Sequence, residues 1–341
     1  MITRKEVAKR AGVSEATVSR VFTNHPSVKK ETKEKVLRVA EELGYTPNAL
    51  AQSVARRRSM NIGVVVPYVP KVHIFSHDYF SEIISGIGEV AQEHGYDLVL
   101  FHRHLHQDMD YRRYYMNKKV DGTILLGTRT EEQEALTDLY RLDLPFVLIS
   151  NMLEMVPQYS ILADHQRGSY EAMRHLVRLG HRRIAFLNGP DSYMDSIYRR
   201  KGVEQAREEW NLRELLYFQG DFSRTSGLRF ADLFVQLDPR PTAVFAANDR
   251  MAIGFMQGLK QHGVFPGLEV AIVGYDNSQI AQFSDPSLTT VHVPHFEMGK
   301  MAVEVLIRQL EGKKFHGPHI LPTELIVRES STQFEVDEKS L

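Results

Sequence analysis

A short segment near the amino terminus carries side chains suited to reading the edges of base pairs. Thr17, Ser19 and Arg20 are hydrogen-bond donors with no carboxylate among them. A guanidinium can bond twice to a guanine in the major groove, whereas hydroxyl groups more often bond to phosphates. Glu15 can accept from a cytosine amine, and Ala16 offers an apolar contact to a thymine methyl. Each residue alone fits a solvated helix face equally well, but together they predict DNA contact.

Such contacts need a small rigid frame, and the flanking residues predict one. Thr3 and Glu6 have the spacing of a capping box, in which each side chain bonds to the backbone of the other residue. Gly12 can take the left-handed turn between two helices, and Ser14 can cap the second helix. Two short helices around such a turn match a helix-turn-helix.

Apolar side chains at helical spacing predict how this frame packs. The second helix should cover residues 15–22, and the third should cover 30–43 and end at Gly44, a favourable C-cap. A three-helix unit of this size also fits a protein-binding module, but the donors on the second helix favour DNA. The side chains expected to point inward are Val7, Ala8, Ala11, Val18, Val21, Phe22, Val36, Leu37, Ala40 and Leu43.

Charge is divided unevenly along the chain. Residues 1–60 carry 13 Lys and Arg against 6 Asp and Glu, so this segment is net +7 and the remainder −8. A basic segment joined to an acidic body is expected when one end contacts a polyanion, although a solvated charged face gives the same count.

The absence of cysteine excludes disulfides and thiolate chemistry. No signal segment or membrane-length apolar run is found, so we expect a cytoplasmic protein with no membrane partner.

From residue 61 onward, short apolar runs alternate with longer amphipathic ones. This alternation predicts parallel sheets covered by helices on both faces. The segment is too long for one sheet of modest size, so we expect two similar halves with a small molecule bound between them, at the carboxyl ends of the strands. The strands are expected at 62–66, 97–101, 122–126, 146–149, 184–187, 243–246 and 270–273, and the helices at 79–94, 167–179, 197–209, 223–236 and 250–262.

Eight strings of sequence resemble the lactose-repressor (LacI/GalR) family of bacterial regulators. They are VAKRAGVS (7–14), ATVSRV (16–21), LGYTPNALA (43–51), VDG (120–122), LGHRRIA (179–185), PTAVFAAND (241–249), VGYDN (273–277) and LTTV (288–291). The resemblance implies an all-α helix-turn-helix domain at 1–48, a hinge helix and linker at 49–60, and an α/β effector-binding domain at 61–331 with the fold of periplasmic sugar-binding proteins. One parallel-sheet half would comprise 61–161 and 293–320 and the other 162–290 and 323–331, with a frayed tail at 332–341.

The resemblance also implies which residues touch DNA. In this family the hinge helix enters the minor groove and inserts a side chain between base steps. Val54 stands where a leucine is usual, so the wedge here is shorter. The DNA-binding residues carried over are Thr3, Ser14, Glu15, Ala16, Thr17, Ser19, Arg20, Tyr45, Asn48, Ala51, Val54 and Ala55.

A second set of positions would contact the effector. Aromatic faces can stack on a sugar or a base, Arg199 offers a rigid fork of donors, and Asp276 and Asn248 can accept from hydroxyl groups. Phe222 fits a core position as well, and Asp249 is interpreted as a helix N-cap. Ser150 and Val293 replace polar residues frequent in the family, so the effector's identity does not follow. The effector-binding residues carried over are Tyr79, Phe80, Tyr193, Asp195, Arg199, Phe222, Asn248 and Asp276.

Other functions are weighed against this one. His102, His104 and His106 alternate after a predicted strand, but the expected continuation into a loop disfavours a metal site, and no cofactor is expected. An enzyme would need a convergent acid/base or nucleophile set, and a transport protein would need a signal segment and no head. We therefore expect a homodimeric repressor of carbohydrate-related genes that binds a near-palindromic operator and a sugar or sugar derivative. A sugar sensor without operator specificity and a regulator responding to a purine-like ligand stay open.

Overall fold

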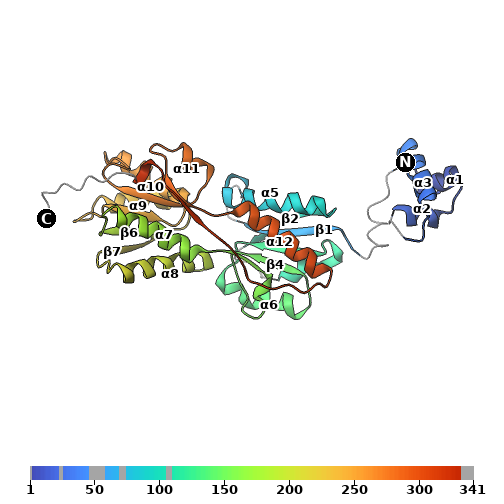
Figure 1. The fold of residues 1–341 in the computed structure, drawn as a ribbon, viewed down its shortest axis with the longest axis horizontal. Helices are drawn as coiled ribbons and strands as arrows, with labels where there is room; N and C mark the ends of the chain where they lie inside the picture. The colour runs from blue at the N-terminus through green and yellow to red at the C-terminus, as the bar shows by residue number, and fades with distance from the viewer. Residues whose placement is uncertain (1, 23–25, 46–57, 69–73, 105–109, 332–341) are drawn as a thin grey trace. The chain divides into compact units, whose positions relative to one another are not determined.

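The chain folds into two units, which are described separately. The computed structural model describes residues 2–22, 26–45, 58–68, 74–104 and 110–331 (Figure 1). The smaller unit comprises residues 1–61 and 115–121, and the larger unit comprises 62–114 and 122–341. We call the three helices of the smaller unit the head, and the two sheets of the larger unit with their helices the body.

The head consists of α1 (Arg4–Ala11), α2 (Glu15–Phe22) and α3 (Lys30–Glu42). The predicted capping box is confirmed, because the amide of Glu6 donates to Thr3 Oγ1 and the amide of Thr3 donates to the Glu6 carboxylate at 2.7 Å. Gly12 ends α1 with a left-handed φ of 66°. The Ser14 hydroxyl accepts from the amide of Thr17 at 3.1 Å, which confirms it as the cap of α2.

The core of the head contains the predicted apolar residues with one exception. Val7, Val18 and Val36 are fully buried at its centre. Leu37 was predicted to be buried but is 39% exposed. At 3.6 residues per turn the inward face of α3 follows Val36 and its neighbours three, four and seven positions later, so Val39 takes the place expected for Leu37.

The carboxylate of Asp121 fastens the end of the linker that leads from the head. It accepts hydrogen bonds from the amide of Ser59 at 2.6 Å and from the amide of Met60 at 3.0 Å. Met60 has a left-handed φ of 59°, so the backbone turns sharply before the first strand of the body.

The body contains two six-stranded sheets. The first has the order β11-β5-β4-β3-β1-β2, and the second has the order β12-β10-β9-β8-β6-β7. In the first sheet, the described pairings among β1, β3, β4, β5 and β11 are all parallel. In the second sheet, the edge strand β12 pairs antiparallel with β10, and the other described pairings are parallel. The fold is therefore the predicted pair of mainly parallel sheets.

The strands and helices alternate along most of the body, as expected. The strands are β1 (Asn61–Tyr68), β2 (Asp97–His104), β3 (Gly122–Leu126), β4 (Phe146–Ile149), β5 (Ser160–Ala163), β6 (Ile184–Asn188), β7 (Leu215–Gln219), β8 (Ala243–Ala246), β9 (Ala271–Asp276), β10 (Thr289–His292), β11 (His319–Leu321) and β12 (Glu324–Ile326). The helices are α5 (Asp78–Glu93), α6 (Gln133–Arg141), α7 (His165–Arg178), α8 (Met194–Glu209), α9 (Arg224–Phe234), α10 (Asp249–Gln261), α11 (Gln279–Phe283) and α12 (His295–Leu310).

The helices cover the sheets in packed pairs. On the first sheet α5 packs against α12, and on the second α7 packs against α8 and α9 against α10 (Figure 1). Close approach of α5 and α12 depends on glycine, because a Cβ on Gly299 would lie 2.1 Å from the carbonyl oxygen of Ile83. Among the described residues, no helix has the length and hydrophobicity needed to cross a membrane.

The chain passes between the two sheets three times. It leaves the first sheet after β5 and enters α7, returns from β10 into α12, and passes again from β11 to β12. Each sheet with its helices is called a half of the body. The first half includes α5, α6 and α12, and the second includes α7 to α11. Five strands, β5, β7, β10, β11 and β12, have no counterpart among the strands predicted from the alternation of apolar runs.

Candidate functional site

The residues that follow the strands of the body have unusual backbone conformations. Ser150 follows β4 with a φ of 62°, Phe222 follows β7 with a φ of 65°, and Asp276 ends β9 with a φ of 103°. A non-glycine residue in this region costs about 1–3 kcal/mol, and such residues concentrate at binding sites. All three lie at carboxyl ends of strands, where ligands bind in open α/β sheets.

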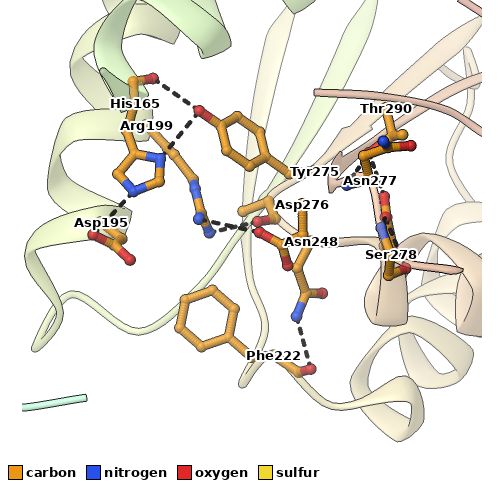
Figure 2. Close-up of polar contacts among 12 residues, drawn as sticks. His165, Asp195, Arg199, Phe222, Asn248, Tyr275, Asp276, Asn277, Ser278 and Thr290 are labelled. Atoms are coloured by element: carbon orange, nitrogen blue, oxygen red, sulfur yellow. Dashed lines mark hydrogen bonds and ion pairs between the residues drawn. The ribbon is translucent and has the colours of Figure 1, made fainter. Parts of the chain in front are cut away.

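Arg199 lies at the centre of a buried polar cluster on the second half. The cluster consists of His165, Asp195, Arg199, Tyr275 and Asp276 (Figure 2). Nη1 of Arg199 donates to the carbonyl oxygen of Ala247 at 2.6 Å, and Nη2 lies 3.5 Å from Oδ1 of Asp276. The guanidinium also lies 4.2 Å from the ring centroid of Tyr275. Contacts on three sides hold this cation in one orientation despite its burial.

Burial and the neighbouring positive charge shift the pKa values of the two carboxyl groups of the cluster in opposite directions. Burial raises the pKa of Asp276 well above its ordinary value, against the attraction of Arg199. Burial also acts to raise the pKa of Asp195, but His165, Arg199 and Ser150 together lower it below its ordinary value. Asp195 is therefore the carboxylate that stays ionised most readily, and it can accept a hydrogen bond from a ligand.

His165 joins Asp195 to Tyr275. Its Nδ1 lies 3.1 Å from the hydroxyl of Tyr275, and its Nε2 lies 3.1 Å from Oδ1 of Asp195. Burial lowers the pKa of His165, so the ring is neutral. We assign the proton to Nε2, which donates to Asp195, and Nδ1 then accepts from the Tyr275 hydroxyl.

Aromatic rings from both halves accompany this cluster. On the first half Tyr79 packs edge-on against His295, with ring centroids 5.1 Å apart, and against Phe80 at 4.9 Å. On the second half Tyr193 packs edge-on against Phe222 at 5.9 Å. Burial raises the pKa of Tyr79, and the charge of Asp195 raises it further, so the two halves influence each other electrostatically.

Phe222 is not simply a core residue. Its ring lies over Gly189, where an added Cβ would come within 2.1 Å of the ring. The side chain is only partly buried, and its carbonyl oxygen accepts from Nδ2 of Asn248 at 3.0 Å. Figure 2 shows the ring beside the guanidinium of Arg199, and the two centres lie 6.0 Å apart.

The start of α10 corrects one prediction. Asp249 was interpreted as the N-cap of this helix, but the cap is Asn248, whose Oδ1 accepts from the amide of Met251 at 2.9 Å. Asp249 instead accepts from the amide of Ser278 at 2.7 Å and from the hydroxyl of Thr290 at 2.5 Å. Burial raises the pKa of Asp249 to about 6. Its role is to fix the segment that follows β9, and with it Asp276.

A second buried ion pair fixes the loop after β3. Nη1 of Arg103 bonds to Glu132, Nη2 donates to the carbonyl oxygen of Gly127 at 2.6 Å, and the Tyr111 hydroxyl bonds to the other oxygen of Glu132. This loop reaches the second half, because the amide of Thr130 donates to the carbonyl oxygen of Ser192 at 2.8 Å. No sequence pattern indicated this pair, whose members lie 29 residues apart.

A second contact joins the two halves at the start of α5. The amide of Gln279 donates to Oδ2 of Asp78 at 2.7 Å. The charge of Asp78 also attracts the guanidinium of Arg250. Burial lowers the pKa of Arg250, and this attraction offsets only part of that shift. Two hydrogen bonds, from Thr130 to Ser192 and from Gln279 to Asp78, therefore link the halves near the residues predicted to bind the effector. A change in the angle between the halves would alter both bonds.

The head presents the residues predicted to read DNA along α2. Ala16 and Arg20 are exposed on the side away from the buried Val18 and Val21. Ser14 and Thr17 bond to each other through their hydroxyl groups at 2.9 Å. Tyr45 packs its ring edge-on against Phe22, with centroids 5.7 Å apart, so much of this side chain belongs to the core of the head. The remaining predicted DNA-binding residues, Asn48, Ala51, Val54 and Ala55, lie outside the described residues.

The prediction from sequence omitted two histidines of this region. His165 and His295 each begin a helix directly after the chain passes from one half to the other. Burial, together with the positive charge of Arg199, lowers the pKa of His295 to about 3. The strands that precede them, β5 and β10, were not predicted, so the sequence pattern offered no signal for these two histidines.

The three alternating histidines do not form a described metal site. His102 and His104 lie on β2 with both side chains exposed, and His106 lies outside the described residues. The strand extends through His104, further than predicted. Within the described part of the chain, no group of three or more His, Asp or Glu side chains is arranged to hold a metal ion.

Comparisons with known protein families match both units. A model of bacterial regulatory proteins of the lacI family matches residues 3–48, and a model of the periplasmic binding protein-like domain matches residues 173–331. The HTH-type transcriptional repressor CytR of Escherichia coli (strain K12) is 32% identical over 335 residues, which cover 96% of each chain.

Solved structures are similar over the same length. The lac repressor dimer bound to operator and the anti-inducer ONPF is 27% identical, with a TM-score of 0.86 over 97% of this chain and 99% of that one. The complex of the transcriptional regulator CelR with cellobiose is 30% identical, with a TM-score of 0.73 over 97% of this chain and 100% of that one.

Proposed function

Because the chain belongs to the lacI family of bacterial regulatory proteins, we propose that it represses its target genes as a homodimer on a near-palindromic operator, under the control of a sugar or sugar derivative. The protein is a DNA-binding transcriptional repressor with an effector-binding domain, and it is not an enzyme. It acts on DNA in the cytoplasm. The proposed domains are the DNA-binding domain at 1–48, the hinge helix and linker at 49–60, and the effector-binding domain at 61–331.

The observation that carries the DNA-binding part is the arrangement of α2. Its apolar side chains are buried against α1 and α3, and Ala16 and Arg20 are exposed. In a helix-turn-helix the second helix enters the major groove, and two heads of a dimer contact half-sites about one helical turn or more apart. Val54 and Ala55 of the proposed hinge helix would contact the minor groove.

The buried polar cluster supports a polyhydroxylated effector. Its only fixed cation among the described residues, Arg199, is already bonded to Asp276 and Ala247, while Asp195 offers carboxylate oxygens as acceptors. Asn248 was predicted to accept from a ligand hydroxyl, but its Oδ1 already accepts from the amide of Met251. Tyr79, Phe80, Tyr193 and Phe222 supply aromatic faces for the apolar side of a sugar ring. The related CelR structure contains cellobiose. A change in the angle between the halves on binding would alter DNA affinity, typically by about 1–3 kcal/mol.

Exposed apolar side chains on the second half support self-association. Ile280 and Phe283 of α11 are 49% and 76% exposed, and Leu268 is 74% exposed. Ile280 and Phe283 lie three residues apart on one helix, and an exposed apolar pair of this kind is typical of a surface that meets a partner. Sedimentation of the full chain should give a dimer, and Phe283→Glu should shift it toward monomer.

A gel-shift experiment tests the function as a whole. The full chain is titrated against DNA from upstream of its own gene, beside Arg20→Glu and a matched control, Arg38→Glu, which makes the same charge change on α3. We expect Arg20→Glu to abolish binding and Arg38→Glu to weaken it far less. Unchanged affinity in Arg20→Glu, or retained DNA binding after deletion of residues 1–60, would refute the proposal.

Thermal unfolding with sugars, sugar phosphates and nucleobases then identifies the effector class, because a ligand that binds the folded state raises Tm.

A further inference from the structure

An ion pair joins the first residues of the two helices that face each other in the head. Nε of Arg4 lies 3.3 Å from Oε2 of Glu15, at the start of α1 and α2 respectively. Both side chains stay accessible, with 47% and 44% of their surface exposed. Exposed ion pairs contribute little to stability, so stability alone gives no reason for this contact.

The backbone on both sides of the pair is held firmly. Arg4 lies inside the capping box of Thr3 and Glu6, and Glu15 directly follows Ser14, which caps α2. The helices themselves pack through the fully buried Val7 and Val18. The two side chains therefore leave rigid positions, and the bond between them further restricts the guanidinium before any ligand arrives.

The pair uses only one edge of each group. The ion pair involves Nε of Arg4, and among the described residues no hydrogen bond or ion pair involves its Nη1 or Nη2. Likewise, Glu15 uses Oε2 and keeps Oε1 as an acceptor. The pair thus combines two parallel donors with an adjacent acceptor, at the amino-terminal end of the helix that in a helix-turn-helix meets the base edges.

Resting on the proposed DNA-binding function, we propose that Arg4 and Glu15 together read one G·C base pair in each half of the operator. In the major groove guanine presents the acceptors O6 and N7, and cytosine presents the N4 amine as a donor. The Nη groups of Arg4 bond to the guanine, and Oε1 of Glu15 accepts from the cytosine amine. Arg4 also neutralises a carboxylate that DNA phosphates would otherwise repel. In this proposal Glu15 orients the guanidinium of Arg4 toward the edge of a base rather than toward a phosphate.

Selection from a random DNA library locates the base pair. The full chain and Arg4→Met are each used to select operators, with Lys5→Met as the control, because Lys5 is an exposed cation on the same turn of α1. We expect Arg4→Met to lose the preference for guanine at one position of each half-site, by roughly 10- to 100-fold. Lys5→Met should weaken binding to all sequences alike and keep every preference.

Modified bases then identify the atoms. Replacing the guanine by 7-deazaguanine removes N7 and should lower the affinity of the natural chain about tenfold, yet leave Arg4→Met unaffected. Inosine keeps O6 and N7 and should bind like guanine. Glu15→Gln should relax the preference partly, because a neutral amide holds the guanidinium less firmly.

Two results would overturn the inference. One is a uniform loss across all sequences in Arg4→Met, which would assign Arg4 to a phosphate. The other is an unchanged set of selected operators. If the natural chain selects no sequence at all, the proposed function itself fails. If instead the natural chain selects an operator whose base preferences are the same in Arg4→Met, the proposed function stands and only the role of Arg4 is wrong.

Discussion

Nε2 of His165 lies 3.1 Å from Oδ1 of Asp195, and this contact helps to hold the carboxylate in place. Burial keeps the imidazole neutral by lowering its pKa, and the pKa of Asp195 is lowered as well, so a neutral donor meets a charged acceptor. His165 therefore acts as a positioning residue for the proposed effector contact.

Replacing His165 by Phe should destabilise the body by about 2 kcal/mol, because a hydrogen bond to a charged group is lost and the carboxylate stays buried. Asp195→Asn removes that charge, so the double variant should lose clearly less than the sum of the two single variants. Urea unfolding of the four proteins gives these free energies. Strictly additive losses would contradict the assigned bond.

Replacing Arg199 by Met should abolish the response to the effector while operator affinity without effector changes only a few-fold. The guanidinium links Ala247, Asp276 and Tyr275 but lies in the body, apart from the residues proposed to read DNA. Arg200→Met is the matched control, since this neighbour is 43% exposed and bonds to Asp191. The measurement is operator affinity with and without a saturating effector. An equal loss of response in both variants would show that the change is not specific to the cluster.

Stability should fall as the pH is lowered from 7 to 5, and His295 should account for part of the loss. Burial lowers the pKa of His295 to about 3, whereas in the unfolded chain its pKa is 6.5. The unfolded state therefore binds more protons below pH 6.5, and the imidazole destabilises the fold by about 2 kcal/mol at pH 5. His295→Phe keeps an aromatic ring against Tyr79 and should flatten the pH dependence by this amount. Parallel curves for the two proteins in urea unfolding would refute the assignment.

Gly299→Ala should destabilise the body by about 1–3 kcal/mol, because its Cβ would lie 2.1 Å from the backbone of Ile83 where α5 and α12 touch. Gly88→Ala on α5 is the control, since the nearest atom to its Cβ would be Leu98 Cδ1, at 3.9 Å. This control should be neutral or stabilising, because alanine favours the helix. Thermal unfolding distinguishes the two, and a similar Tm for both variants would count against close packing of these helices.

Local signals predicted the head closely. The capping box of Thr3 and Glu6, the left-handed Gly12 and the cap at Ser14 each depend on neighbouring residues, so the sequence contains the whole interaction. The prediction that Leu37 is buried was wrong, because the inward face of α3 carries Val36, Val39 and Ala40 and leaves Leu37 on the outer side.

In the body, the sequence pattern predicted seven strands with apolar runs, but it missed five short strands, β5, β7, β10, β11 and β12. β5 is only four residues long, and β7 lies at a sheet edge with alternating exposure. The candidate site was predicted through family resemblance rather than pattern. The partners Arg103 and Glu132, and also His165 and Asp195, are brought together only by the completed sheets, so no local feature announces them.

The third passage of the chain between the sheets has a consequence for synthesis on the ribosome. β11 completes the edge of the first sheet and β12 that of the second, and both lie within the last 25 residues or so of the chain. A nascent polypeptide that stops before residue 319 leaves both sheets unfinished, although its head, made first, is already complete. Such a fragment would carry a folded head beside a body whose sheets each expose an unpaired strand edge, which favours aggregation.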